Sequence, residues 1–137
     1  MRHIQAKDRK EYRGLLSEII VRQVSKGRRV LLIDCMNCID QHIFGTNDIA
    51  TVMKNLYVAR IEQADDLAEI LMTLPRERHY KMSDLLIVSS FERLLDGLPD
   101  SDQVKDKIAR ALSRLRKDII MIGIKRRWDT QYRLKDG

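Results

Sequence analysis

The stretch Val30-Leu31-Leu32-Ile33-Asp34-Cys35-Met36-Asn37-Cys38 places four aliphatic residues directly before an aspartate and a C-x-x-C pair. A continuous aliphatic run of this length is typical of a strand that is buried on both faces of a parallel sheet. Two later runs, at residues 85–88 and 119–124, have the same character. The sequence therefore predicts a sheet whose central strands are covered on both sides.

Amphipathic stretches alternate with these aliphatic runs. Residues 8–26 carry apolar side chains at helical spacing, and Gly27 follows where a helix cap is expected. By the same reasoning we expect helices over residues 47–54, 62–74 and 101–117, and further strands at residues 2–5, 56–61 and 130–134. Strands that alternate with helices form parallel βαβ units. We therefore expect an α/β fold of three layers, a mostly parallel sheet with helices on both faces.

Length and composition suggest one domain and an anionic partner. A chain of 137 residues fits a single domain over residues 1–137. Its net charge of +6 and pI near 9.5 suit a nucleic-acid partner without requiring one. Because the chain has neither a signal-peptide pattern nor an apolar run long enough to span a membrane, we expect a cytoplasmic protein with no membrane partner.

The C-x-x-C pair has two chemical interpretations, a redox dithiol or half of a metal site. Thioredoxin-like folds place a cis-proline opposite the dithiol, but Pro75 and Pro99, the two prolines of the chain, do not begin a strand. Zinc needs four ligands, and the three histidines are scattered. We expect no metal and no cofactor, and a dithiol oxidoreductase that uses Cys35 and Cys38 remains an alternative.

Four segments, taken in order, carry a family resemblance. A turn at residues 26–29 leads into Val30–Asp34, and Asn55-Leu56-Tyr57-Val58-Ala59-Arg60 precedes an expected helix. Residues 85–90 read Leu-Leu-Ile-Val-Ser-Ser, and residues 128–134 read Trp-Asp-Thr-Gln-Tyr-Arg-Leu. Together these segments resemble the ATPase core of the RecA/RadA superfamily, including its KaiC-like and RadB-like archaeal relatives. The resemblance implies a single, truncated RecA-like domain.

The phosphate-binding loop that this resemblance implies, called Walker A, is degenerate here. Counting back from Ile33-Asp34, the pattern G-x-x-x-x-G-K-[ST] falls on residues 6–13. Ala6 and Glu11 replace the glycines whose backbone N–H groups surround phosphate. Tyr12 replaces the lysine that reaches the β- and γ-phosphates, and Arg13 replaces the hydroxyl that holds Mg²⁺. We expect no phosphate cradle at this position.

Two further positions of the implied nucleotide site have also changed. Met36 stands where the family has the glutamate that activates water, and Ser89 replaces the Walker B aspartate that helps to hold Mg²⁺. The resemblance therefore implies a RecA-like core without a functional P-loop and without ATPase activity. Within it, Cys35 and Cys38 are interpreted as substitutions in a former active site.

These observations predict a protein that acts by binding. By resemblance, we expect a non-catalytic paralogue that serves as an accessory module in DNA recombination and repair, with DNA, a recombinase or a second copy of the chain as partners. The basic segment Lys125-Arg126-Arg127-Trp128 is the candidate DNA contact, since cations bind phosphates and Trp stacks on a base. A KaiC-like protein-interaction or regulatory module without DNA binding is the alternative. Few residues precede the first expected strand, so filament assembly is not expected.

Two smaller expectations concern the surface. Met36, Met53, Met72 and Met82 lie among aliphatic residues and are expected in the core. The segment Arg76-Glu77-Arg78-His79 is expected to form a solvated loop and not a functional site.

Overall fold

The computed structural model describes residues 1–37, 39, 44–45 and 49–125. Its sheet has five strands in the order β1-β5-β4-β2-β3, and every neighbouring pair is parallel. The elements are β1 (Arg2–Ala6), α1 (Arg9–Ser25), β2 (Val30–Asp34), α2 (Ile49–Asn55), β3 (Leu56–Arg60), α3 (Ala64–Thr73), η2 (Leu74–Arg76), α4 (Arg78–Met82), β4 (Leu85–Ser89), α5 (Glu92–Leu95), α6 (Ser101–Ser113) and β5 (Asp118–Ile124).

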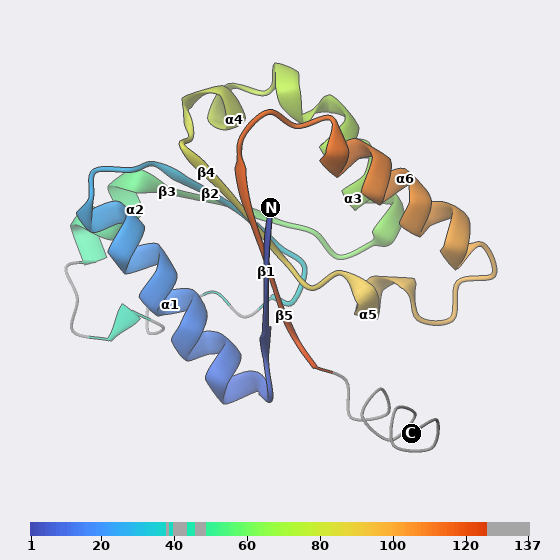
Figure 1. Cartoon of the computed structure of the whole chain (residues 1–137), viewed down its shortest axis with the longest axis horizontal. Coiled ribbons are helices and arrows are strands. Elements are labelled where there is room, and N and C mark those ends of the chain that lie inside the picture. Colours follow the sequence, from blue (N-terminus) through green and yellow to red (C-terminus); the bar gives the residue numbers. More distant parts are fainter. Residues whose placement is uncertain (38, 40–43, 46–48, 126–137) are drawn as a thin grey trace.

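Helices cover both faces of this sheet, with α1 and α2 on one side and α3 and α6 on the other (Figure 1). Side chains of β2 alternate between the two layers, because successive residues of a strand point to opposite faces. Leu31 and Ile33 join the cluster with α3 and α6, whereas Val30 and Leu32 join the cluster with α1 and α2. The expected three-layer α/β architecture is confirmed.

Most expected elements form close to their predicted bounds. Helix α1 ends before Gly27, whose φ of +80° is the left-handed conformation that glycine adopts readily. Helix α6 ends earlier than expected, at Ser113. The N–H groups of Arg114 and Leu115 donate hydrogen bonds to the carbonyl oxygens of Ala111 and Leu112, three residues earlier, and this tight turn closes the helix. The strand expected at residues 130–134 lies outside the described residues.

The loop expected at residues 76–79 is wrong, since η2 ends at Arg76 and α4 begins at Arg78. Arg76, Glu77 and Arg78 are nevertheless exposed to solvent, as expected. The Glu77 carboxylate caps α4 by accepting hydrogen bonds from the N–H groups of His79 and Tyr80, at 2.7 and 3.2 Å.

The methionine expectation is correct only for Met36, which is buried. The side chains of Met53, Met72 and Met82 are 53%, 60% and 45% exposed. Each lies on the outer side of a helix or at its end, so aliphatic neighbours along the chain did not indicate burial.

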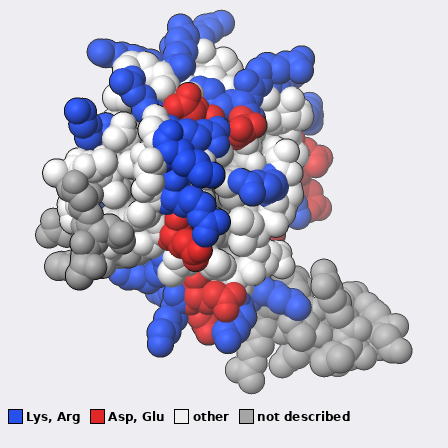
Figure 2. All heavy atoms as spheres, turned by 60° about the vertical axis from the view of Figure 1, so that its left-hand side comes forward, with Lys and Arg blue, Asp and Glu red and all other residues white. Residues whose placement is uncertain are grey.

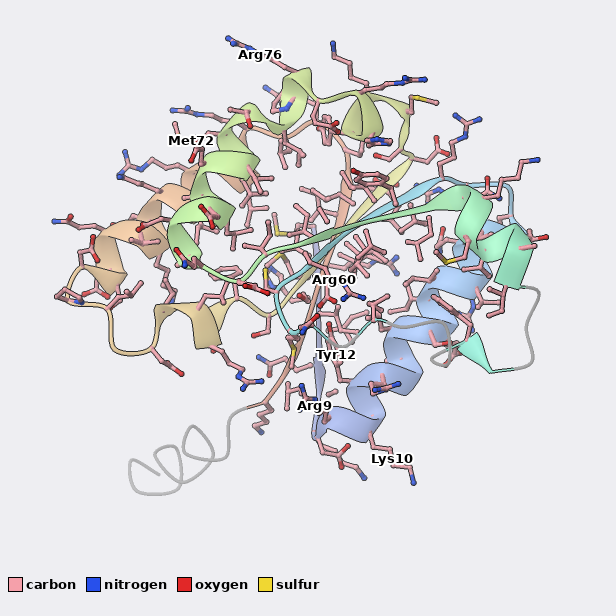
Figure 3. All side chains as sticks on the ribbon, turned by 180° about the vertical axis from the view of Figure 1, so that it is seen from behind. Arg9, Lys10, Tyr12, Arg60, Met72 and Arg76 are labelled. Carbon is pink, nitrogen blue, oxygen red and sulfur yellow. The ribbon has the colours of Figure 1, made fainter. Side chains whose placement is uncertain are left out.

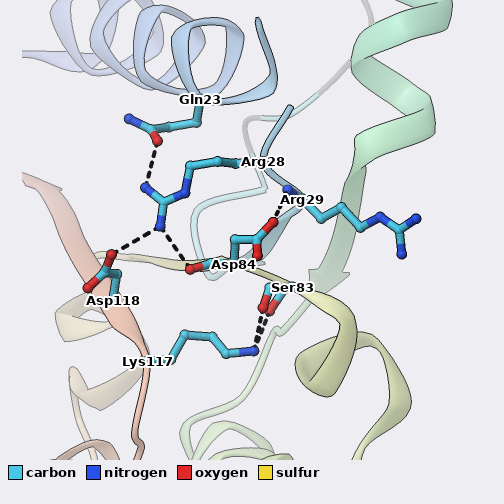
Figure 4. A network of polar contacts seen from close by, with 7 residues as sticks. All are labelled: Gln23, Arg28, Arg29, Ser83, Asp84, Lys117 and Asp118. Atoms are coloured by element: carbon cyan, nitrogen blue, oxygen red, sulfur yellow. Dashed lines mark hydrogen bonds and ion pairs between the residues drawn. The ribbon is translucent and has the colours of Figure 1, made fainter. Parts of the chain in front are cut away.

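Polar contacts join the amino ends of three strands (Figure 4). The Arg28 guanidinium donates to the side chain of Gln23 at 2.8 Å, to the Asp84 carbonyl at 3.0 Å and to the Asp118 carboxylate at 3.0 Å. The Asp84 carboxylate in turn accepts the N–H of Arg29 at 2.9 Å. One cation therefore connects the end of α1 to the starts of β4 and β5.

Lys117 makes a second connection at this edge. Its ammonium donates to the carbonyl oxygens of Tyr80 and Ser83 and lies 4.0 Å from the centre of the Tyr80 ring. Burial lowers the pKa of Lys117, and the nearby Asp84 carboxylate opposes that shift. These contacts hold α4 against the start of β5.

We predict that Arg28→Met destabilises the fold by about 1–2 kcal/mol, because it removes the donor that the buried Gln23 side chain shares with two exposed acceptors, at Asp84 and Asp118. The matched control is Arg22→Met, which removes an exposed i,i+4 ion pair with Glu18 at 2.8 Å and should cost less than about 0.5 kcal/mol. Urea unfolding followed by circular dichroism measures both. Equal losses in the two variants would contradict a special role for Arg28.

Candidate functional site

The carboxyl ends of parallel strands form the edge at which α/β proteins usually bind ligands. Ala6, at the end of β1, lies next to the end of β5, where the Lys125 N–H donates to the Ala6 carbonyl at 2.7 Å. Ser89 ends β4, and Met36 follows β2. The structure therefore brings to one edge the positions that the sequence assigned to a nucleotide site.

The junction between β1 and α1 is closed by the chain's own carboxylates. Only Lys7 and Asp8 separate the strand from the helix, and α1 begins at Arg9, before the position of the second Walker A glycine. The Asp8 carboxylate accepts the N–H of Glu11 at 2.8 Å, and the Glu11 carboxylate accepts the N–H of Lys7 at 3.3 Å. Two negative groups thus satisfy donors at the helix N-terminus, where a phosphate would otherwise bind.

Tyr12 stands at the position where the resemblance implies a phosphate-binding lysine. It is fully buried and belongs to the same apolar cluster as Met36 and Phe44. In Figure 3, Tyr12 lies on the inner side of α1, whereas Lys10 points away from the sheet. Arg13 is half-buried on the same helix. The side chain that replaces the lysine therefore packs in the core and does not face a ligand.

The turn after β2 is built around a buried aspartate. Asp34 is 1% exposed, and its carboxylate accepts the N–H groups of Met36 and Ile39 at 3.1 and 3.4 Å. Asn37 has a φ of +52°, which completes the tight turn. The Met36 side chain enters the core, so this position offers no group that could act as a general base.

The Ser89 hydroxyl is used inside the sheet. It accepts the N–H of Cys35 at 2.5 Å and donates to the Ile33 carbonyl at 3.2 Å, and Ser89 is fully buried. This hydroxyl therefore joins the carboxyl ends of β2 and β4. It points into the protein, where it cannot reach a cation at the surface.

Cys35 is a poor nucleophile in this setting. Burial raises the pKa of its thiol to about 12, the Ser89 hydrogen bond opposes that shift, and the Asp34 charge adds to it. A thiol with this pKa stays protonated at neutral pH, and only the thiolate attacks disulfides. Cys38 lies outside the described residues.

A basic hollow of about 330 Å³ opens at this edge. Its cationic lining residues are Arg9 from α1, Arg93 from α5 and Lys125 after β5, and its lining includes no carboxylate. Lys125 is the only member of the predicted DNA-binding segment within the described residues, because Arg126, Arg127 and Trp128 lie outside them. Arg93 was missed from the sequence, although it closely follows β4.

The same edge depends on a glycine. A Cβ atom added at Gly123 would lie 2.7 Å from the Cβ of Ser90, which is closer than real side chains come. Glycine at this position of β5 therefore lets the segment after β4 pass beside it. That segment leads to α5 and places Arg93 at the hollow.

No group of three His, Cys, Asp or Glu side chains is arranged as metal ligands within residues 1–37, 39, 44–45 and 49–125. In the same part of the chain, no helix is both long and apolar enough to cross a membrane.

No protein-family model matches this sequence, and no curated protein matches it. Among solved structures, the crystal structure of the RadB recombinase is similar, with a TM-score of 0.61 at 10% sequence identity. The match covers 90% of this chain and 60% of the RadB chain, so this protein spans only part of that structure's length. At this identity the likeness establishes the fold. The chain has a RecA-like core.

We predict that Asp8→Ala destabilises the protein by about 1 kcal/mol, because it removes the side-chain cap of α1. Asp100 provides the matched control, since it precedes α6 but its side chain makes no capping hydrogen bond. Asp100→Ala should change the free energy of unfolding by less than about 0.5 kcal/mol. Thermal unfolding of the two variants makes this comparison, and a smaller effect at Asp8 than at Asp100 would be inconsistent with the cap.

We predict that Cys35 resists alkylation by iodoacetamide at pH 8 in the folded protein, because its raised pKa of about 12 leaves almost no thiolate. Mass spectrometry in a Cys38→Ser background measures modification of Cys35 alone. The same sample in urea is the control and should be alkylated rapidly. Rapid modification without denaturant would revive the dithiol interpretation.

Proposed function

We propose that this protein is a non-catalytic RecA-like module that acts by binding, in DNA recombination or repair. The observation that carries the proposal is the Asp8 carboxylate, which accepts the Glu11 N–H at 2.8 Å at the start of α1. A polyphosphate at this point would face two carboxylates, those of Asp8 and Glu11, in place of free N–H groups. The fold that the chain shares with the RadB recombinase supports the proposed setting.

Absence of hydrolysis is supported by the environments of the other site residues. The Ser89 hydroxyl is engaged by backbone groups of β2, and the Met36 side chain is buried. Mg²⁺ prefers oxygen ligands and retains several waters, so it needs carboxylate or hydroxyl oxygens that solvent can reach. Neither position supplies one. The degenerate Walker A and Walker B positions therefore agree with one another.

A binding role is supported by charge. The chain carries a net charge of +6, and Lys and Arg are spread over the face shown in Figure 2, with Asp and Glu in smaller groups between them. Arg93 and Lys125 add positive charge at the carboxyl edge. We propose DNA phosphates, or a recombinase that carries DNA, as the partner. A dithiol oxidoreductase is disfavoured by the raised pKa of Cys35.

We predict that isothermal titration with ATP and Mg²⁺ gives no saturable heat, and that phosphate release stays at the level of buffer alone. Folding of the same sample is checked by circular dichroism. Saturable binding that depends on Mg²⁺ and is lost in Arg93→Glu would contradict the proposal, because it would show a working nucleotide site at the carboxyl edge.

A further inference from the structure

A second hollow lies at the opposite edge of the sheet, where strands begin. It measures about 440 Å³ and lies between the end of α2, the starts of β2 and β3, and α4. We call it the amino-edge groove and define it by Arg29, Lys54, Tyr57, Arg78 and His79. It shares no residue with the hollow at the carboxyl edge, so it is not part of the former nucleotide site.

The groove is cationic. Three different segments supply Arg29, Lys54 and Arg78, and no Asp or Glu is among its lining residues. In the described part of the chain, none of these three side chains has a hydrogen bond or ion pair. Figure 4 shows why for Arg29: its backbone N–H is bound by Asp84, while its guanidinium points away from that network. The positive charge is therefore available to an external anion.

A ring stack lies among these cations. The rings of Tyr57 and His79 are nearly parallel, with an angle of 12° between their planes and 3.6 Å between their centres. Tyr57 is nevertheless 46% exposed. Because His79 covers one face of the tyrosine ring, a flat aromatic ligand has access to the remainder and would extend the stack.

Methionine side chains border the same groove. Met53 and Met82 both line it, and both are more than two-fifths exposed. Thioethers are polarisable and make favourable contacts with aromatic rings. The two thioethers therefore add apolar contact area for a flat ring beside the Tyr57–His79 stack.

We propose that the amino-edge groove binds single-stranded nucleic acid, with a base stacked on Tyr57 and phosphates at Arg29, Lys54 and Arg78. One nucleotide supplies both a flat ring and an anion, which matches the stack and the cations together. An acidic peptide matches the cations but presents no ring to the stack unless it also carries an aromatic residue. The proposal rests on the binding role proposed above and assigns that role a second surface.

Fluorescence anisotropy with fluorescein-labelled (dT)12 tests the cations. We expect Arg78→Glu to weaken binding about tenfold, since it reverses one phosphate-contacting charge. Arg76→Glu is the matched control, because Arg76 is exposed, lies two residues earlier and does not line the groove (Figure 3). It should weaken binding by about twofold or less. An equal loss of affinity in both variants would mean that the net charge of the protein, and not the groove, determines binding, and it would overturn the proposal.

Substitution of Tyr57 tests the stack. Tyr57→Phe should keep the affinity within about twofold, whereas Tyr57→Leu should weaken it about fivefold or more, because stacking on a base needs an aromatic face. An unchanged affinity in Tyr57→Leu would overturn the base contact.

In the double variant Lys54→Gln/Arg78→Gln, the slope of log affinity against log salt should become shallower by about 1.4, as two lost contacts to a single strand imply.

The outcomes also separate this inference from the proposed function. If the protein binds (dT)12 and the groove variants bind equally well, the groove assignment fails while DNA binding stands. If the protein binds no (dT)12, both the groove assignment and the DNA role fail. Competition by poly-glutamate that is stronger than competition by unlabelled (dT)12, and is lost in Arg78→Glu, would assign the groove to an acidic protein partner and overturn the proposal.

Discussion

Burial of β2 and β4 on both faces is the constraint on which the other features depend. Every residue of these adjacent strands is buried, so their backbone polar groups must be satisfied within the sheet and their side chains must alternate between two apolar layers. The four strand pairs are all parallel, so the five strands run in the same direction. All amino ends therefore lie at one edge of the sheet and all carboxyl ends at the other, and each edge brings together polar groups from distant parts of the sequence.

At the carboxyl edge, several polar side chains stabilise the fold through hydrogen bonds to nearby backbone groups. Asp34 holds its own turn, Ser89 joins β2 to β4, and Asp8 caps α1. A polar group used in this way gains hydrogen bonds that do not depend on a ligand, but it is no longer available to one. The Asp34 and Asp8 carboxylates and the Ser89 hydroxyl are therefore satisfied by backbone groups of the protein and need no ligand.

At the amino edge, some cations are bound within the described part of the protein and others are not. Arg28 and Lys117 are committed to contacts within the protein, whereas Arg29, which directly follows Arg28, keeps its guanidinium free of described partners. Adjacent arginines thus have separate roles, one structural and one available for binding. The stacked Tyr57 and His79 lie beside these cations, so this edge combines flat rings with positive charge.

The sequence by itself determined the α/β class and the order of the five described strands and of α1, α2, α3 and α6. These depend on local periodicity and on aliphatic runs, which one-dimensional patterns record directly. The RecA-like core and the place of residues 6–13 after the first strand came from the family resemblance, and the short helices α4 and α5 were not predicted. Only the tertiary structure decided that Met53 and Met82 are exposed, that Tyr57 stacks on His79, and that Lys54 and Arg78 lie at one groove. Parallel strands bring together residues more than twenty positions apart, and no pattern within a single segment encodes which side chains then become neighbours.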